Sequence, residues 1–327
     1  MSKPKTKSPP DYAIEIGGLN KTYSGNSLQS AKEALIDINL KIPRGSFFGL
    51  LGPNGAGKST IINIMAGLVI KSSGEVKVWD YDIEKEMRQA RSSIGIVPQE
   101  LNIDPFFTPR EVLETQAGLY GVPKSERRTA EILSAVHLSD KADAYARSLS
   151  GGMRRRLLVA KAMVHSPPVL VLDEPTAGVD VELRQQLWSY IRGLRDHGTT
   201  ILLTTHYLEE AEELCDQIAI INHGKLITSQ KTEDLLRSLD VKELIVTLDI
   251  RLTKIPEKLN KFNVELGKNG KLIFRIPPTK VTVESILGAI RAAGYKIMDL
   301  STKESDLEDI FLLMTSNHKK SNAITHP

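Results

Sequence analysis

A glycine-rich stretch at residues 52–59, GPNGAGKS, combines residue types that suit phosphate binding. Glycines let successive backbone N–H groups point at phosphate oxygens, and a helix that starts there adds positive potential. The apolar run before it and the helical run after it favour this interpretation over a plain glycine turn. We expect Lys58 to reach the β- and γ-phosphates of a nucleotide and Ser59 to bind Mg²⁺. The candidate nucleotide-binding residues of this loop are Gly52, Pro53, Asn54, Gly55, Ala56, Gly57, Lys58, Ser59 and Thr60.

Two adjacent carboxylates, Asp173 and Glu174, follow an apolar run at residues 169–172. Alone, such a pair is typical of a solvated strand end. Paired with a phosphate-binding loop, it predicts the second element of a nucleotide site. We then expect Asp173 to bind Mg²⁺ through water and Glu174 to polarise the water that attacks the phosphate.

A third motif, SLSGGM at residues 148–153, precedes this carboxylate pair. It resembles the signature of the ATP-binding-cassette (ABC) ATPases, usually LSGGQ, with Met153 in place of Gln as in ABC-2 type exporters. Ser150, Gly151 and Gly152 lie where a helix should begin, which favours an anion. The resemblance implies a second phosphate clamp, and an ordinary N-cap on a helix with a buried stripe is compatible with it.

Four further residues each resemble a functional residue of the ABC ATPase family. Tyr23 resembles the aromatic residue that stacks on adenine, although a packed tyrosine is the alternative. Gln99 resembles the Q-loop glutamine that reaches Mg²⁺ and the attacking water. His206 resembles the switch histidine that contacts the γ-phosphate, and the other histidines are expected to be structural or solvated. Asp180 resembles the D-loop aspartate at the dimer interface, and it is equally suited to cap the next helix.

Two charged runs lie beside these motifs, and we expect both to be solvated helix faces. One is the arginine run at residues 154–156, for which a nucleic-acid or lipid surface is the alternative. The other is the acidic run at residues 209–213, near a predicted helix start.

The apolar spacing predicts the elements that position these residues. Short β-type runs alternate with helical stretches between about residues 12 and 228, which indicates an α/β domain with a largely parallel sheet. From residue 108 to 143 the pattern is helical only, opened by Thr108 as N-cap, Pro109 and a capping-box Glu111. We therefore expect a helical subdomain at about residues 101–165. The β-type runs are residues 34–42, 47–51, 169–172, 200–204 and 218–221.

The pattern changes after residue 240 to a βαββαβ order, which predicts a small α+β ferredoxin-like domain at residues 240–316. A last amphipathic helix begins with a capping box at residues 305–308. Its LEDIF sequence, residues 307–311, is similar to the closing motif of ABC-2 exporter ATPases. The polar ends, residues 1–11 and 317–327, are predicted to be disordered tails.

Composition limits the function classes. The chain has 327 residues with 43 Lys and Arg against 40 Asp and Glu, which is too balanced to indicate a nucleic-acid partner. Cys215 is the single cysteine, so no internal disulfide forms and a reducing cytoplasm is the expected compartment. No apolar run approaches the ~18 residues that span a bilayer. We expect the chain on the cytoplasmic face of the plasma (inner) membrane through a partner.

The resemblance to ABC ATPases covers roughly residues 12–230. It implies a P-loop NTPase cassette with a RecA-like core, an antiparallel β subdomain and a helical subdomain. It further implies an ATPase that uses ATP and Mg²⁺ and forms a head-to-tail homodimer, because the signature cannot reach its own P-loop in this fold. The helical insertion would receive a separately encoded ABC-2 type permease subunit. A soluble ABC ATPase acting on ribosomes or DNA, and an importer motor, are the alternatives.

Overall fold

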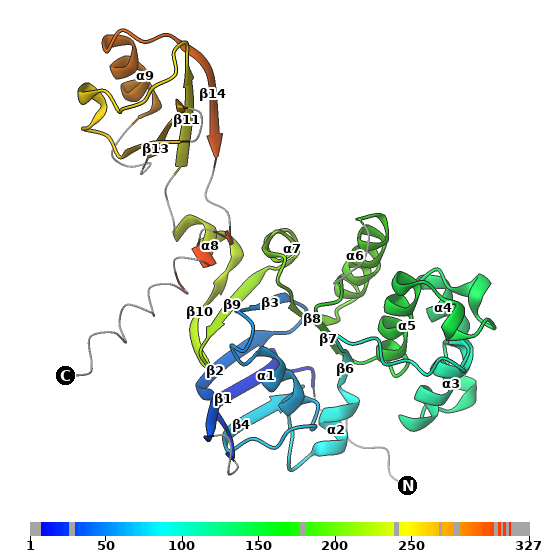
Figure 1. Cartoon of the computed structure of the whole chain (residues 1–327). Coiled ribbons are helices and arrows are strands. Elements are labelled where there is room, and N and C mark those ends of the chain that lie inside the picture. The colour runs from blue at the N-terminus through cyan, green and yellow to red at the C-terminus, as the bar shows by residue number, and fades with distance from the viewer. Residues whose placement is uncertain are drawn as a thin grey trace. The chain divides into compact units, whose positions relative to one another are not determined.

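The computed structural model describes residues 8–25, 30–176, 181–238, 242–267, 270–276, 282–303, 307–308, 310–311 and 314. Most of the two predicted tails, residues 1–7 and 317–327, lies outside this part of the chain. The chain divides into two compact units, Met1–Lys231 and Thr232–Pro327 (Figure 1). Among the described residues, no helix is both long and apolar enough to cross a membrane.

A six-stranded sheet forms the centre of the first unit, in the order β10-β9-β3-β8-β7-β6. The five strands from β9 to β6 are parallel, and β10 is antiparallel to β9. Every residue of β3 and of β8 is buried, as expected for parallel strands that are covered on both faces. The strands are β3 (Phe47–Leu51), β6 (Ile94–Val97), β7 (Val169–Asp173), β8 (Thr200–Thr204), β9 (Gln217–Asn222) and β10 (Lys225–Lys231).

The parallel direction of these strands brings four loops to one edge of the sheet. The loops after β3, β6, β7 and β8 begin at residues 52, 98, 174 and 205. In open α/β sheets, ligands bind in the crevice outside the carboxyl ends of the strands. The predicted phosphate-binding residues therefore share one edge because of topology, although they are far apart in the sequence.

A second sheet, of order β2-β1-β4-β5, is antiparallel. Its buried residues, such as Ile38 and Leu40, join one apolar core with Phe48 of β3 and Ile61 of helix α1. The core thus joins this sheet, the helix that follows the P-loop and the central sheet. The elements are β1 (Tyr12–Tyr23), β2 (Lys32–Pro43), β4 (Ser73–Val78), β5 (Tyr81–Asp82), α1 (Lys58–Met65) and α2 (Met87–Ser92).

Helices α3 (Pro109–Leu119), α4 (Thr129–Ala135) and α5 (Gly151–Met163) gather around their own apolar core beside the β6 end of the sheet (Figure 1). The predicted capping box is present, because the Thr108 hydroxyl accepts from the Glu111 N–H and the Glu111 carboxylate accepts from the Thr108 N–H. Between β6 and β7 the described residues contain only helices and turns. Two further helices, α6 (Val181–Asp196) and α7 (Leu208–Leu214), flank β8 in the sequence.

The second unit contains a four-stranded antiparallel sheet of order β12-β13-β11-β14. This is the strand order of a ferredoxin-like βαββαβ domain, with its first helix reduced to a 3-10 turn at Glu257–Leu259. Leu307 and Ile310, on the predicted last helix, are buried, whereas the capping residues 305 and 306 lie outside the described residues. The elements are α8 (Thr232–Ser238), β11 (Lys242–Leu248), β12 (Val264–Leu266), β13 (Leu272–Ile276), α9 (Val283–Ala292) and β14 (Ile297–Lys303).

Candidate functional site

The loop between β3 and α1 passes so close to its neighbours that its glycines are required. A Cβ atom at Gly52 would meet the backbone oxygen of Ile221 at 2.3 Å, and one at Gly57 would meet that of Ala34 at 2.8 Å. Gly55 and Gly57 also have φ angles of +80° and +115°, where other residues are strained. The sequence of the loop is therefore explained by its backbone path.

A cavity of about 380 Å³ lies over this loop. It brings together residues from four segments that the sequence predicted to serve one nucleotide, including Tyr23, of which 39% is exposed. Its lining residues are Tyr23, Lys32, Ala34, Asn54, Gly55, Ala56, Gly57, Lys58, Ser59, Thr60, Gln99 and Glu174.

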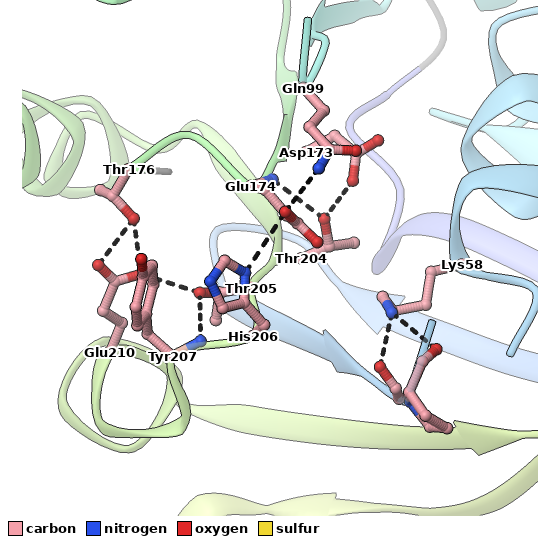
Figure 2. Close-up of polar contacts among 12 residues, drawn as sticks. Lys58, Gln99, Asp173, Glu174, Thr176, Thr204, Thr205, His206, Tyr207 and Glu210 are labelled. Atoms are coloured by element: carbon pink, nitrogen blue, oxygen red, sulfur yellow. Dashed lines mark hydrogen bonds and ion pairs between the residues drawn. The ribbon is translucent and has the colours of Figure 1, made fainter. Parts of the chain in front are cut away.

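Lys58 supplies a buried positive charge to this cavity. The residue is 8% exposed, and its Nζ donates to the backbone oxygens of Gly52 at 2.6 Å and Pro53 at 3.2 Å (Figure 2). Burial lowers the pKa of the Lys58 amine, whereas the charges of Glu174 and Asp173 raise it. An ammonium group held by neutral carbonyl oxygens fits an anionic ligand such as a triphosphate, which would offset the cost of burying the charge.

Asp173 and Glu174 lie at the end of β7 and have different surroundings. The Asp173 carboxylate accepts a hydrogen bond from the Thr204 hydroxyl, and burial raises the pKa of Asp173. Glu174 has a φ angle of +47°, in the left-handed region, and its N–H donates to the Thr204 backbone oxygen at 3.0 Å. Such strain is found at functional sites, where the surrounding structure holds a side chain in place.

Gln99 and His206 reach the carboxylate of Glu174 from opposite sides (Figure 2). Gln99 Nε2 donates to Glu174 Oε2 at 2.8 Å, and His206 Nδ1 lies 3.4 Å from the same oxygen. The Glu174 side chain is 13% exposed and that of His206 is 51% exposed. Three residues from the loops after β6, β7 and β8 thus meet at one carboxylate beside the phosphate-binding loop.

The donor set at this edge fits Mg²⁺ bound together with phosphate. Among the described residues, no group of three or more His, Cys, Asp and Glu side chains forms a metal cage. Mg²⁺ is usually bound by one or two carboxylates together with phosphate oxygens, and it keeps several waters. The Asp173 carboxylate, the Ser59 hydroxyl and the Gln99 amide oxygen are ligands of this kind.

A buried network behind the cavity was missed by the sequence analysis. Glu210 is 6% exposed, and it accepts from the Thr176 hydroxyl at 2.8 Å and the Thr205 hydroxyl at 3.0 Å. The prediction that the acidic run at residues 209–213 is solvated is therefore wrong for Glu210. The signal was its place on one helical stripe with Ala211 and Leu214, which are also buried.

The prediction of a solvated arginine run is also wrong for two of its three members. Arg155 is 4% exposed and donates to the backbone oxygens of Pro98 at 2.8 Å and Gln99 at 2.9 Å. Arg156 is 7% exposed and donates to the backbone oxygens of Val136 and His137. The physical reason is that α5 is enclosed on all sides, since residues 157–160 are all buried.

The signature motif lies apart from the cavity over the P-loop. Ser150 is the N-cap of α5, its hydroxyl accepting from the Met153 N–H at 3.2 Å. Ser150, Gly151 and Gly152 are absent from the cavity lining. The D-loop candidate Asp180 lies outside the described residues.

Comparisons with known proteins agree with this geometry. Residues 35–177 match the ABC transporter family. The chain is 34% identical to Nod factor export ATP-binding protein I of Ralstonia nicotianae, covering 94% of this chain and 95% of the relative. It is 35% identical to the daunorubicin/doxorubicin resistance ATP-binding protein DrrA of Streptomyces peucetius, covering 94% of each. It is 36% identical to the linearmycin resistance ATP-binding protein LnrL of Bacillus subtilis, covering 85% and 92%.

Solved structures give the same result. An ATP-binding subunit of an ABC transporter aligns with a TM-score of 0.63 and 27% identity, covering 69% of this chain and 92% of that one. A dimeric ATP-binding cassette in a post-hydrolysis state with ADP and Pi aligns with a TM-score of 0.60 and 26% identity, covering 67% and 98%.

Proposed function

The chain belongs to the ATP-binding proteins of ABC transporters, and from this membership we propose that it drives an ABC-2 type membrane exporter. It is an ATP-binding and ATP-hydrolysing subunit. The observation that carries the assignment is the meeting of Gln99 and His206 at the Glu174 carboxylate, beside the cavity that contains Lys58.

The residues in and around the cavity have separate roles in this proposal. The N–H groups of residues 52–60 and the Lys58 amine bind phosphate oxygens, and Tyr23 stacks on the adenine. Ser59, Asp173 and Gln99 hold Mg²⁺, which when bound neutralises charge on the phosphates. The surroundings of Lys58 support phosphate binding. Its amine donates to two neutral carbonyl oxygens, and a charged phosphate oxygen would be a stronger hydrogen-bond partner.

Glu174 orients the attacking water and accepts its proton on the carboxylate. The Oε2 atom of that carboxylate lies between the Gln99 amide and the His206 ring. Both groups keep the carboxylate aimed, and a base must lie within hydrogen-bond reach of the proton that it takes. His206 then contacts the γ-phosphate, since its side chain is half exposed at the same edge.

Two copies complete each other's sites. Ser150, Gly151 and Gly152 do not line the P-loop cavity of their own chain, which supports a site that a second chain completes. A related cassette was solved as a dimer. We infer a head-to-tail homodimer with two ATP molecules between the copies, and Asp180 at its interface.

The exporter assignment follows from the relatives, whose names describe Nod factor export and resistance to daunorubicin, doxorubicin and linearmycin. It favours a transporter over an ATPase acting on ribosomes or DNA, and an exporter over an importer. The partner is a separately encoded ABC-2 type permease, which holds the chain at the cytoplasmic face of the plasma (inner) membrane.

A groove of about 480 Å³ suits a helix of this permease. Residues of α1, β6, α3 and α5 line it, and Pro98, the residue before Gln99, is part of its wall, as is Asp173 at the end of β7. Leu68 also lines it and is 77% exposed, an apolar surface that a partner helix would cover. Docking there would press directly on the loop that carries Gln99.

The proposal is tested by isolating the tagged chain from gently lysed cells. We expect it in the membrane fraction with one polytopic membrane protein, and Leu68→Glu should weaken that association without changing ATP binding. Ile70→Glu is the matched control, because Ile70 is 81% exposed but does not line the groove. Recovery with ribosomes or nucleoid, and never with a membrane protein, would contradict the exporter assignment.

A further inference from the structure

Arg155 is a buried charge that the proposed roles leave unused. It lies within α5, is 4% exposed, and donates through Nη1 to the Pro98 oxygen and through Nη2 to the Gln99 oxygen. Burial lowers the pKa of its guanidinium, whereas the charges of Asp173 and Glu174 raise it. Burying a guanidinium costs free energy unless its N–H groups are hydrogen-bonded, so these two contacts stabilise the buried charge of Arg155.

The contact determines where the Gln99 side chain reaches. A planar guanidinium that binds two successive carbonyl oxygens constrains the orientation as well as the position of the peptide between them. The Gln99 side chain leaves that peptide and donates to Glu174 Oε2 at 2.8 Å. Arg155 therefore acts on the backbone of Gln99, and Gln99 contacts the catalytic carboxylate.

The same helix begins at the signature motif. Ser150 caps α5, and Arg155 lies five positions farther along the helix, a rise of about 7.5 Å. The helix is enclosed by packing at residues 157–160, so it moves as a rigid element. A displacement of Ser150 along with α5 is accordingly passed to the Gln99 loop.

We propose that Arg155 is a positioning residue that ties the Gln99 loop to α5, so that the segments carrying Ser150 and Gln99 move together. The inference rests on the proposed function, in which both residues serve ATP hydrolysis. When Ser150 of one copy closes on the site of the other, Arg155 makes the Gln99 loop of its own copy move with α5, which changes the contact between Gln99 and Glu174. Closure of one ATP site is thereby coupled to the position of Gln99 in the second ATP site.

Arg156 provides a matched comparison. It is 7% exposed, and its Nη1 donates to the backbone oxygens of Val136 at 2.8 Å and His137 at 3.2 Å. Both arginines are buried on one helix and bind two carbonyl oxygens, but Arg156 anchors α5 to the segment after α4. If the Arg155 and Arg156 variants differ in kcat, the difference is due to the contact with the Gln99 loop, because both variants lose a buried arginine.

The test is a double-mutant cycle in the full-length chain. Arg155→Gln, Arg156→Gln and Gln99→Ala, with the two double variants that include Gln99→Ala, are first checked for folding by thermal unfolding and then assayed for steady-state ATPase activity. We expect Arg155→Gln to lower kcat about 10-fold or more, with KM for ATP within about twofold. In the Gln99→Ala background it should change kcat little, whereas Arg156→Gln should act equally in both backgrounds.

If Arg155→Gln does not fold, Arg155→Lys takes its place, because it keeps the charge but loses the two-pronged contact. Its effect on kcat should likewise be small in the Gln99→Ala background. A wild-type kcat in the folded Arg155 variant overturns the proposal. So does an Arg155 effect that persists undiminished in the Gln99→Ala background, or an equal loss of additivity for Arg156→Gln. Absence of ATPase activity in the wild-type chain is distinct from these results, and it would contradict the proposed function.

Discussion

At the scale of single residues, Glu174 has several constraints that act on one side chain. Its backbone is in the left-handed region, its N–H is held by Thr204, and its carboxylate is contacted by Gln99 and His206. A residue in this conformation persists only where the surrounding structure imposes it. The arrangement fixes the direction of the Glu174 carboxylate, as a base acting on water requires.

Glu174→Gln is expected to bind ATP but to lower kcat about 100-fold or more, because the amide keeps the size of the side chain and cannot accept the proton. The variant should accumulate as an ATP-bound dimer. Steady-state ATPase assays and size-exclusion chromatography in ATP and Mg²⁺ measure both effects. Glu213→Gln, at a side chain that is 71% exposed, serves as the control. Near-normal turnover of Glu174→Gln would mean that another group is the base.

Lys58→Ala should fail at an earlier step, since it removes a direct phosphate contact. We expect ATP affinity to fall about tenfold or more, at roughly 1.4 kcal/mol per factor of ten. Equilibrium binding of a fluorescent ATP analogue measures this without hydrolysis. An unchanged affinity would separate Lys58 from ground-state binding and leave it a role in the transition state alone.

His165 predicts a pH dependence of stability. Its ring stacks on Tyr120 at 3.7 Å, and burial lowers the pKa of His165 to about 4. The unfolded imidazole takes up a proton at its ordinary value of 6.5, whereas the folded one stays neutral to about 4. Lowering the pH from 7 to 5 therefore favours the unfolded state, by about 2 kcal/mol.

Chemical unfolding of the cassette, followed by the fluorescence of Trp79 and Trp188, measures this at the two pH values. Both tryptophans lie in the first unit, so the signal reports that unit. His165→Gln should remove the difference between pH 7 and pH 5 that is due to this residue. An identical pH dependence in both proteins would show that His165 is not its source.

At the scale of elements, α7 joins two segments of the site through Glu210. The carboxylate accepts from Thr176, after Glu174, and from Thr205, before His206. Arg184 of α6 approaches the same carboxylate, with Nε 3.5 Å from Oε1. The buried Glu210 carboxylate thus holds together the loops after β7 and β8, which carry Glu174 and His206.

Glu210→Ala should destabilise the cassette by about 2–3 kcal/mol, because it leaves two buried hydroxyl groups without their acceptor. Activity should fall as well, since Thr205 precedes His206. Glu209→Ala on the same helix is the matched control, because Glu209 is exposed. Urea unfolding and ATPase assays of both variants decide the matter, and equal stability of the two would contradict a structural role for the Glu210 network.

At the scale of the whole molecule, the chain contains two units with separate cores. The described nucleotide-site residues all lie in the first unit, Met1–Lys231, whereas the second has its own sheet and the buried cluster around Phe274. We propose that the second unit adjusts dimerisation or coupling to the permease and takes no part in phosphate chemistry.

A chain truncated after residue 231 is expected to fold and to bind ATP with the affinity of the full chain. The physical reason is that the phosphate-binding loop, the carboxylates and His206 are held by the first core alone. Thermal unfolding by tryptophan fluorescence and ATP titration test this. A truncated chain that folds but no longer binds ATP would place part of the site in the second unit.

The sequence by itself determined the features that depend on near neighbours in the chain. The capping box of Thr108 and Glu111 and the N-cap Ser150 act within a few residues, so their types and spacing were sufficient. The glycines of residues 52–57 were recognised as a motif, but the contacts that require Gly52 and Gly57 come from the distant residues Ile221 and Ala34. The order of strands and helices also followed from apolar spacing, which gave the α/β cassette and the βαββαβ unit. Within the proposed site, Lys58, Ser59, Asp173 and Glu174 were predicted from local motifs, whereas Tyr23, Gln99, His206 and Asp180 were predicted from the resemblance to ABC ATPases.

Only the tertiary structure decided what depends on surfaces brought together from distant segments. Arg155 and Arg156 were expected in solvent, but α5 is enclosed and their guanidinium groups bind carbonyl oxygens more than fifteen residues away in sequence. Glu210 was likewise expected to be exposed, and it is buried against Thr176. A charge run reports hydrophilicity, whereas burial is set by which partners the fold brings close enough to replace water.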